Sequence, residues 1–173
     1  MDHVDKIIEQ WKRERPDLDV GPMELIGRVK RISQHLSRGM EKNYAAHGLT
    51  ASGFDVLATL RRSGKPYALS PGDLMAATMV TSGTMTNRID QLAKEGLVER
   101  IRSEEDKRSF LISLTEKGGA LIDKVLQDHV ITQQELVAGL SEKERVELNE
   151  LLKVFLSGFE GREGSSGSTE IDK

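Results

Sequence analysis

Apolar residues recur every three or four positions near both ends of the chain, which is the spacing of amphipathic helices. The pattern predicts a first helix over residues 2–14, ended by Pro16, and a long second helix from about Gly21 to Gly48. One apolar stripe follows the second helix, formed by Met23, Ile26, Val29, Ile32, Leu36 and Met40. Two more long helices are predicted after residue 115. We therefore expect a mainly helical protein whose terminal helices bury long apolar faces.

Shorter elements are predicted in the middle of the chain. Thr50 can cap one helix, Ser70 can cap a short second one, and a third begins near Ser82 and ends at Gly96. The period then changes to two over residues 97–102 and 109–114, which predicts a β-hairpin with an exposed polar tip. This order of elements is that of a winged helix-turn-helix. An α+β domain of another topology also fits the spacing.

The helix that begins near Ser82 has the composition of a DNA recognition helix. Met85, Ile89 and Leu92 form a narrow apolar stripe, and the opposite side is short and rich in hydrogen-bonding groups, as contacts with base edges and phosphates require. The residues assigned to DNA on this helix are Ser82, Gly83, Thr84, Thr86, Asn87 and Gln91. In the hairpin, Arg108 is the expected wing contact, and Asp106 is expected to anchor an arginine or fix the turn rather than touch DNA. The competing interpretation is an ordinary solvated helix face.

Composition narrows the possible functions. The 173 residues carry a net charge of −3, with a pI near 5.9, so attraction to phosphate must come from local patches. One Trp, two Tyr and four Phe are too few for a platform that stacks single-stranded nucleic acid. The absence of cysteine excludes disulfides and thiol chemistry. The histidines lack metal-ligand spacing and no catalytic motif appears, so we expect neither a metal site nor an enzyme.

The ends of the chain carry little targeting information. The N-terminus is charged, and no apolar run approaches the roughly 20 residues of a membrane span, so we expect a cytoplasmic protein without a membrane segment. Residues 161–173 are rich in Gly and Ser, which predicts a disordered tail.

Several motifs resemble the MarR family of winged-helix transcriptional regulators. They are Gly48-Leu49-Thr50, Gly96-Leu97-Val98-Glu99-Arg100, Asp106-Lys107-Arg108 and Leu114-Thr115-Glu116-Lys117-Gly118, in the family's order. The resemblance implies an obligate homodimer that presents two recognition helices to a palindromic site in double-stranded DNA. It also implies an organisation into N-terminal dimerisation helices that wall a ligand pocket (1–47), a winged helix-turn-helix (48–115), C-terminal dimerisation helices (116–160) and a tail (161–173).

Within that family the chain is most similar to the urate-responsive, PecS/HucR-like branch. The resemblance lies in the extra N-terminal helix, the segment Arg15-Pro16-Asp17-Leu18-Asp19 and residues 54–62. By motif, the ligand residues of that branch fall on Trp11, Asp55, Arg88 and Arg100. A planar urate anion would then stack on the indole and accept hydrogen bonds from the arginines.

These inferences combine into one functional hypothesis. We expect a dimeric transcriptional regulator, of the repressor type, that needs no cofactor and is released from DNA by urate or a related aromatic or carboxylate anion. Three alternatives stay open. Trp11 can be a dimer-core residue, Asp55 and Arg88 can form a structural ion pair, and the winged helix can serve as a protein-interaction module without specific DNA binding.

Overall fold

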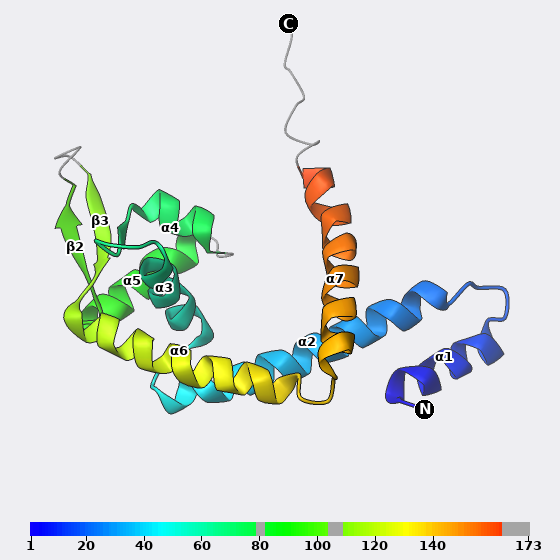
Figure 1. The fold of residues 1–173 in the computed structure, drawn as a ribbon. Coiled ribbons are helices and arrows are strands. Elements are labelled where there is room, and N and C mark those ends of the chain that lie inside the picture. The colour runs from blue at the N-terminus through cyan, green and yellow to red at the C-terminus, as the bar shows by residue number, and fades with distance from the viewer. Residues whose placement is uncertain (79–81, 104–108, 164–173) are drawn as a thin grey trace, which may run out of the picture. The chain divides into compact units, whose positions relative to one another are not determined.

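The computed structural model describes residues 1–78, 82–103 and 109–163, and for residues 82–84 and 161–163 it describes the backbone alone. Figure 1 shows a mainly helical chain with a small sheet, as the sequence predicts. The elements are α1 (His3–Glu14), α2 (Gly21–Ala46), α3 (Ala51–Arg62), β1 (Ala68–Leu69), α4 (Pro71–Ala77), α5 (Ser82–Lys94), β2 (Val98–Arg102), β3 (Phe110–Leu114), α6 (Glu116–Leu136) and α7 (Glu142–Glu163). Two compact units divide the chain, Met1–Gln133 and Gln134–Lys173.

Helix α1 packs on the N-terminal half of α2 around a small apolar core (Figure 1). Val4, Ile8 and Val20 are the buried residues of this core. Gly27 lets the two helices approach, because a Cβ atom there would meet Cγ1 of Val4 at 3.2 Å. The burial of these three apolar side chains stabilises the contact between α1 and α2 through the hydrophobic effect, which has no directional preference.

Arg28 adds a directional contact between the same two helices. Its guanidinium donates to Oε1 of Glu24 at 2.6 Å, to Oδ2 of Asp2 at 2.9 Å, and to Asp5. Glu24 and then Asp2 raise the pKa of Arg28. The carboxylate of Asp2 also caps α1, since its Oδ1 accepts from the amides of Val4 and Asp5 at 2.7 and 3.0 Å. The same acid therefore begins α1 and anchors it to α2.

The main core lies where the C-terminal end of α2 meets α3, α4, α5, α6 and the sheet. Seven of its side chains have no exposed surface: Val56, Leu57, Leu60, Leu74, Ile112, Ile122 and Val125. Helix α3 supplies three of them and contacts α2, α4, α5 and β3. This helix is therefore the central element of the predicted winged helix-turn-helix, which the structure confirms.

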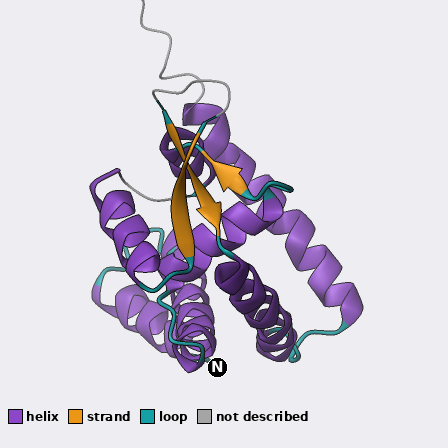
Figure 2. Ribbon diagram, turned by 90° about the vertical axis from the view of Figure 1, so that its left-hand side faces the viewer, coloured by secondary structure: helices purple, strands orange, loops and turns teal. Residues whose placement is uncertain are grey.

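Three strands form one antiparallel sheet in the order β1-β3-β2 (Figure 2). Arg100 faces Ile112 in the β2–β3 ladder, and Leu69 faces Ile112 on the other side. The sequence predicted β2 and β3 but missed β1, because two residues are too few to show a period. Phe110 pairs with Arg102 at the far end of the hairpin and is 46% exposed.

Within the unit Met1–Gln133, the described residues leave the apolar stripe of α2 exposed. Its members Met23, Ile26, Val29, Ile32 and Leu36 are 37–59% exposed. In the second unit, the described part of α7 likewise exposes most of its large apolar side chains, including Leu151, Val154 and Phe155. Helix α7 runs to Glu163, so the predicted tail begins at least three residues later than expected; residues 164–173 lie outside the described residues.

A stack of three rings joins α2, α3 and α6. The ring of Phe54 lies 4.4 Å from that of Tyr44 and 4.7 Å from that of His129, centroid to centroid. The Tyr44 hydroxyl and Nδ1 of His129 are 3.3 Å apart. Burial lowers the pKa of His129, because it disfavours the charged imidazolium. One turn away, His47 Nε2 and Asp128 Oδ2 are 2.8 Å apart and connect the same two helices, α2 and α6.

Gly118 provides a test of the packing of α6 on Leu97, the residue before β2. A Cβ atom at Gly118 would lie 1.9 Å from the carbonyl oxygen of Leu97, whereas one at Gly119 would meet nothing within 4 Å. We expect Gly118→Ala to lower the free energy of unfolding by about 1–3 kcal/mol or more, through overpacking. Gly119→Ala is the matched control and should be neutral or stabilising by up to about 1 kcal/mol, through helix propensity. Urea unfolding followed by circular dichroism measures both, and equal stabilities would contradict the tight contact.

His129 should make folding sensitive to pH. Its pKa in the folded protein lies below the unfolded value of 6.5, so the unfolded chain binds the extra proton and stability falls as the pH drops below 6.5. We expect His129→Phe to flatten this fall by at most about 1.4 kcal/mol per pH unit. His35→Phe, at an exposed position of α2, is the control. Urea titrations between pH 7.5 and pH 5 would show parallel curves for all three proteins if the buried ring were unimportant.

Candidate nucleic-acid interface and effector site

Helix α5 is held by its apolar stripe and shows a polar side to solvent. Met85, Ile89 and Leu92 are only 2–4% exposed, which confirms the predicted stripe. On the other side, Thr86, Asn87 and Gln91 are exposed. Gln91 donates to Oε1 of Glu95 at 3.3 Å, a weak contact that leaves the amide open to other partners. For Ser82, Gly83 and Thr84 only the backbone of the first turn is described.

The short helix α4 is fixed at both ends. Ser70 accepts a hydrogen bond from the amide of Asp73 at 3.1 Å, with Pro71 at the first helical position, as predicted. At the other end, Arg62 donates to the carbonyl oxygen of Ala77 at 2.7 Å. That carbonyl belongs to the last turn, whose acceptors have no partner within the helix. Arg62 therefore connects α4 to α3, and so helps to fix the position of α4, the helix that precedes α5.

An ion pair links α5 to the wing strand β2. Arg100 Nη2 and Asp90 Oδ1 are 2.6 Å apart, and both side chains are 45% exposed. The Arg100 guanidinium also lies over the Phe110 ring, 5.7 Å from its centroid. Arg100, predicted as a ligand residue, thus already has a carboxylate partner. A ligand anion would have to compete with Asp90 for it.

The tip of the wing carries two predicted residues that fall outside the described part of the chain, Asp106 and Arg108. At its base, the amide of Ser103 donates to the carbonyl of Ser109 at 3.1 Å and closes the hairpin. Arg102, at the end of β2, is exposed. The sequence prediction missed this residue, although alternation along the strand places it on the same face as Arg100.

The four predicted ligand residues lie on four elements: Arg88 lines one recess, Trp11 lines a pocket between α1 and α2, and neither of these two hollows holds a second member of the set. Arg88 lines a recess of about 20 Å³ beside the N-terminal end of α3, which has room for about one water molecule. Neither Asp55 nor Arg100 lines that recess. Asp55 lies near Tyr44, and burial together with this carboxylate raises the pKa of the phenol. Among the described residues no ion pair joins Asp55 to Arg88, so that alternative is not realised here.

Trp11 lies at the opposite end of α2 from the other three residues. Its helix is anchored at Arg28, whereas the helix of Asp55 contacts α2 at Tyr44. At the helical rise of 1.5 Å per residue, these two anchor points are about 24 Å apart along α2. That is several times the length of a two-ring anion. A single chain therefore cannot place Trp11 and Asp55 on the same small ligand.

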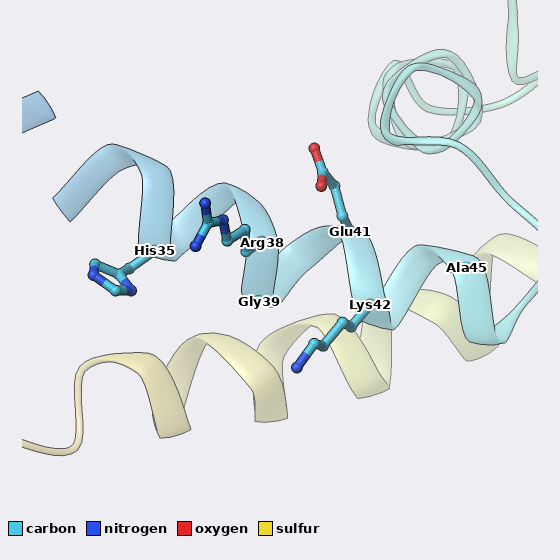
Figure 3. A pocket seen from close by; sticks show the side chains of 6 residues that line it. All are labelled: His35, Arg38, Gly39, Glu41, Lys42 and Ala45. Atoms are coloured by element: carbon cyan, nitrogen blue, oxygen red, sulfur yellow. The ribbon is translucent and has the colours of Figure 1, made fainter. Parts of the chain in front are cut away.

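A further hollow lies on the C-terminal half of α2 (Figure 3). It is lined by residues of this one helix: His35, Arg38, Gly39, Glu41, Lys42 and Ala45. With no wall from a second element it cannot enclose a ligand. In the part of the chain that the structure describes, no three His, Asp or Glu side chains gather as metal ligands would, and no helix is long and apolar enough to cross a membrane.

An exposed polar helix, fixed by its apolar stripe between α3 and a two-stranded wing, defines a winged-helix DNA-binding protein. The chain belongs to the MarR family of transcriptional regulators. The family model matches residues 47–109. The transcriptional regulator PecS of Dickeya dadantii (strain 3937) is 43% identical over 149 residues, which cover 86% of this chain and 90% of that protein. This similarity places the chain on the PecS branch and confirms the predicted family.

Two solved structures show what related chains bind. A MarR variant from Escherichia coli, complexed with operator DNA, is 27% identical with a TM-score of 0.67, covering 84% of this chain and 97% of that one. BpsR of Bordetella bronchiseptica, whose DNA binding is regulated by 6-hydroxynicotinic acid, is 28% identical with a TM-score of 0.65, covering 75% of this chain and 90% of that one. The relatives are thus regulators rather than enzymes.

Proposed function

We propose that this transcriptional regulator is a homodimeric repressor that binds a palindromic duplex and leaves it when a small anion such as urate binds. The observation that carries the proposal is the geometry of α5. Its stripe of three buried side chains turns Thr86, Asn87 and Gln91 outward beside the wing. Their amide and hydroxyl groups suit base edges in the major groove.

The homodimer is supported by the uncovered apolar face of α2. Five large side chains at 37–59% exposure form one stripe, which is costly to leave in water. A second copy, related by a twofold axis, can cover the stripe with the identical stripe of its own α2. Two such subunits would offer two recognition helices, and a twofold-symmetric protein matches a palindromic site.

The DNA contacts divide into two kinds. Asn87 and Gln91 carry amides that can read bases, while the first turn of α5, with Ser82, Gly83 and Thr84, presents backbone amides and a positive helix end to a phosphate. On the wing, Arg108 remains the contact proposed from sequence, and the exposed Arg102 at its base is a second cation within the same hairpin.

The effector is proposed to act on the arginines around α5. Arg88 is part of the recognition helix, and Arg100 ties that helix to the wing through Asp90 at 2.6 Å. An anion that binds both arginines near Asp55 would weaken the Asp90 pair and shift α5 relative to the wing. Trp11 can join such a site only from the partner subunit, because the α2 residues that anchor the helices of Trp11 and Asp55, Arg28 and Tyr44, are about 24 Å apart along α2.

Specific base contacts should be detectable one by one. We expect Asn87→Ala and Gln91→Ala to weaken binding to the specific duplex about tenfold each, within the about 1–3 kcal/mol of a base contact. Arg108→Ala should weaken binding to every duplex and reduce the salt slope by about one. Fluorescence anisotropy on the duplex upstream of the protein's own gene, and on a scrambled duplex, measures both effects over a range of salt concentrations.

The matched control for these variants is Gln127→Ala, which removes an exposed amide from α6. It should bind DNA as the unaltered protein does. Equal and weak binding to specific and scrambled duplexes at all salt concentrations would contradict the repressor and favour the protein-interaction module.

The effector site predicts a selective loss of response. We expect Asp55→Ala and Arg88→Ala to raise the urate concentration needed for release from DNA by about tenfold or more, because each removes a charged hydrogen-bonding group. The same anisotropy assay, with urate titrated into the preformed complex, measures the shift. Glu99→Ala, at an exposed position of β2, is the control. Unchanged release in both site variants would refute the assignment of these residues.

A further inference from the structure

The C-terminal end of α5 is closed by a turn whose last carbonyl groups point away from the helix. Gly96 follows α5 with a φ of 72°, and its amide donates to the carbonyl oxygen of Ala93 at 3.0 Å. The amide of Leu97 donates to the carbonyl oxygen of Leu92 at 2.9 Å. These two bonds form the Schellman type of helix end. They leave the carbonyl groups of Glu95, Gly96 and Leu97 to find partners outside the helix.

The residues that begin α6 supply these partners. The hydroxyl of Thr115 donates to the carbonyl oxygen of Gly96 at 2.7 Å. Nζ of Lys117 donates to the carbonyl oxygen of Glu95, also at 2.7 Å. The backbone amide of Thr115 donates to the carbonyl oxygen of Leu97 at 3.2 Å. Three hydrogen bonds therefore connect the start of α6 to the end of α5 and the turn that follows it.

Thr115 serves both helices at once. Its Oγ1 atom accepts from the amide of Gly118 at 3.0 Å, so the oxygen that donates to the end of α5 also caps α6. Gly118 lets the first turn of α6 lie against the carbonyl of Leu97. The negative end of the α5 dipole thus meets the positive end of the α6 dipole, which is a favourable arrangement. We call this contact, formed by Thr115, Lys117 and Gly118 with residues 95–97, the α5–α6 joint.

Helix α6 is itself held by other helices of the same unit. Oδ1 of Asp123 accepts from Nε of Arg61 on α3 at 2.6 Å. Farther along α6, Oδ2 of Asp128 lies 2.8 Å from Nε2 of His47 on α2. The joint therefore connects α5 to a helix whose own position is fixed by two neighbours.

The joint restrains a movement that the apolar stripe of α5 leaves possible. The stripe fixes the rotation of α5 about its axis, but hydrophobic contacts have no directional preference and oppose a small tilt only weakly. Asn87 precedes Glu95 by eight residues, which is about 12 Å along a helix. A tilt of about 10° about this end would move Asn87 by about 2 Å, whereas hydrogen bonds form only between about 2.7 and 3.2 Å. Directional contacts at the C-terminal end therefore decide whether the amides of α5 meet their bases.

We propose that Thr115 and Lys117 are positioning residues for DNA recognition, which set the tilt of α5 through the carbonyl groups of Gly96 and Glu95 without touching DNA. The proposal rests on the reading of bases by α5 put forward above. It concerns the opposite side of α5 from the wing, and so acts independently of the Asp90–Arg100 ion pair. Loss of the joint should weaken specific binding alone, because attraction between cations and phosphates does not require a particular tilt.

The test compares the affinity of the full-length protein for the specific and the scrambled duplex by fluorescence anisotropy. Lys117→Met removes the amine and keeps most of the side-chain length, and Thr115→Val removes the hydroxyl and keeps the shape. We expect the specific affinity to fall about threefold in Lys117→Met, whose hydrogen bond is exposed, and about tenfold in Thr115→Val, which also loses the cap of α6. The affinity for the scrambled duplex and the salt slope should stay unchanged.

Matched variants separate positioning from charge and from folding. Lys117→Arg and Thr115→Ser keep the donors and should retain specific binding. Lys124→Met removes the same charge from an exposed position of α6 and should bind both duplexes as the unaltered protein does. Circular dichroism in urea measures the stability of each variant. A loss of folded protein would lower both affinities by the same factor, so the ratio of the two affinities reports on positioning.

Hydrogen exchange followed by NMR tests the joint in the free protein. The amides of Gly96 and Leu97 should exchange faster in Lys117→Met and Thr115→Val than in Lys124→Met, because the turn that they close has lost its outside partners. Unchanged exchange in both variants would refute the joint without reference to DNA.

The DNA measurements carry two further outcomes against the proposal. An unchanged ratio of specific to scrambled affinity in both Lys117→Met and Thr115→Val would overturn the positioning role and leave the proposed repressor intact. Equal binding of the two duplexes by the unaltered protein would instead contradict base reading by α5, and the positioning role would fall with the proposed function.

Discussion

The burial of three side chains of α5 against α3 is the constraint on which the DNA-binding end depends. Met85, Ile89 and Leu92 fall on one narrow line, and the core they enter contains fully buried residues of α3. A stripe this narrow fixes the rotation of a helix about its own axis, since turning it would expose apolar atoms or bury amides without partners. The outward direction of Asn87 and Gln91 is therefore a consequence of packing. The hydrogen bond of Arg62 and the ion pair of Arg100 add to a position of α5 that core packing already determines.

Helix α2 imposes the second constraint, which is one of distance. Because α1 is anchored near Arg28 and α3 near Tyr44, features at the two ends stay about 24 Å apart in one chain. A ligand at either end is too small to bridge them. Communication between the ends of one chain has to pass through the helix itself, or through the partner subunit of the proposed dimer. The ring stack of Tyr44, Phe54 and His129 is where α2 and α6 meet the DNA-binding end, so any rigid movement of these helices is transmitted there.

Local signals in the sequence were sufficient to predict the helices. They were insufficient to predict which elements and side chains pack against one another. The caps at Thr50 and Ser70 and the helix end at Gly96 predicted helix bounds to within a few residues, because capping depends on near neighbours along the chain. The strand β1 could not be predicted, since its two residues pair only with a strand more than forty positions later. The same holds for the site. The polar side of α5 could be predicted from the spacing of its apolar residues alone. The pairing of Arg100 with Asp90 and the separation of Trp11 from Asp55 could not, because both depend on how the elements pack. The resemblance to relatives supplied residue names without saying from which subunit each comes.

The strength of the link between α5 and the wing limits how an anion can act on DNA binding. An exposed ion pair such as that of Asp90 with Arg100 contributes only about 0–1 kcal/mol. Coupling between two ligands in regulated proteins is typically about 1–3 kcal/mol. Breaking this pair in one subunit is therefore too weak to explain full release. In the proposed dimer on a palindrome, however, both recognition helices would have to fit at once, so two bound anions would act on the same complex and their effects would add. The weakness of the Asp90–Arg100 ion pair then suits the proposed mechanism. A stronger ion pair would resist the competing ligand. Without any ion pair, a ligand bound to Arg100 would have no effect on α5.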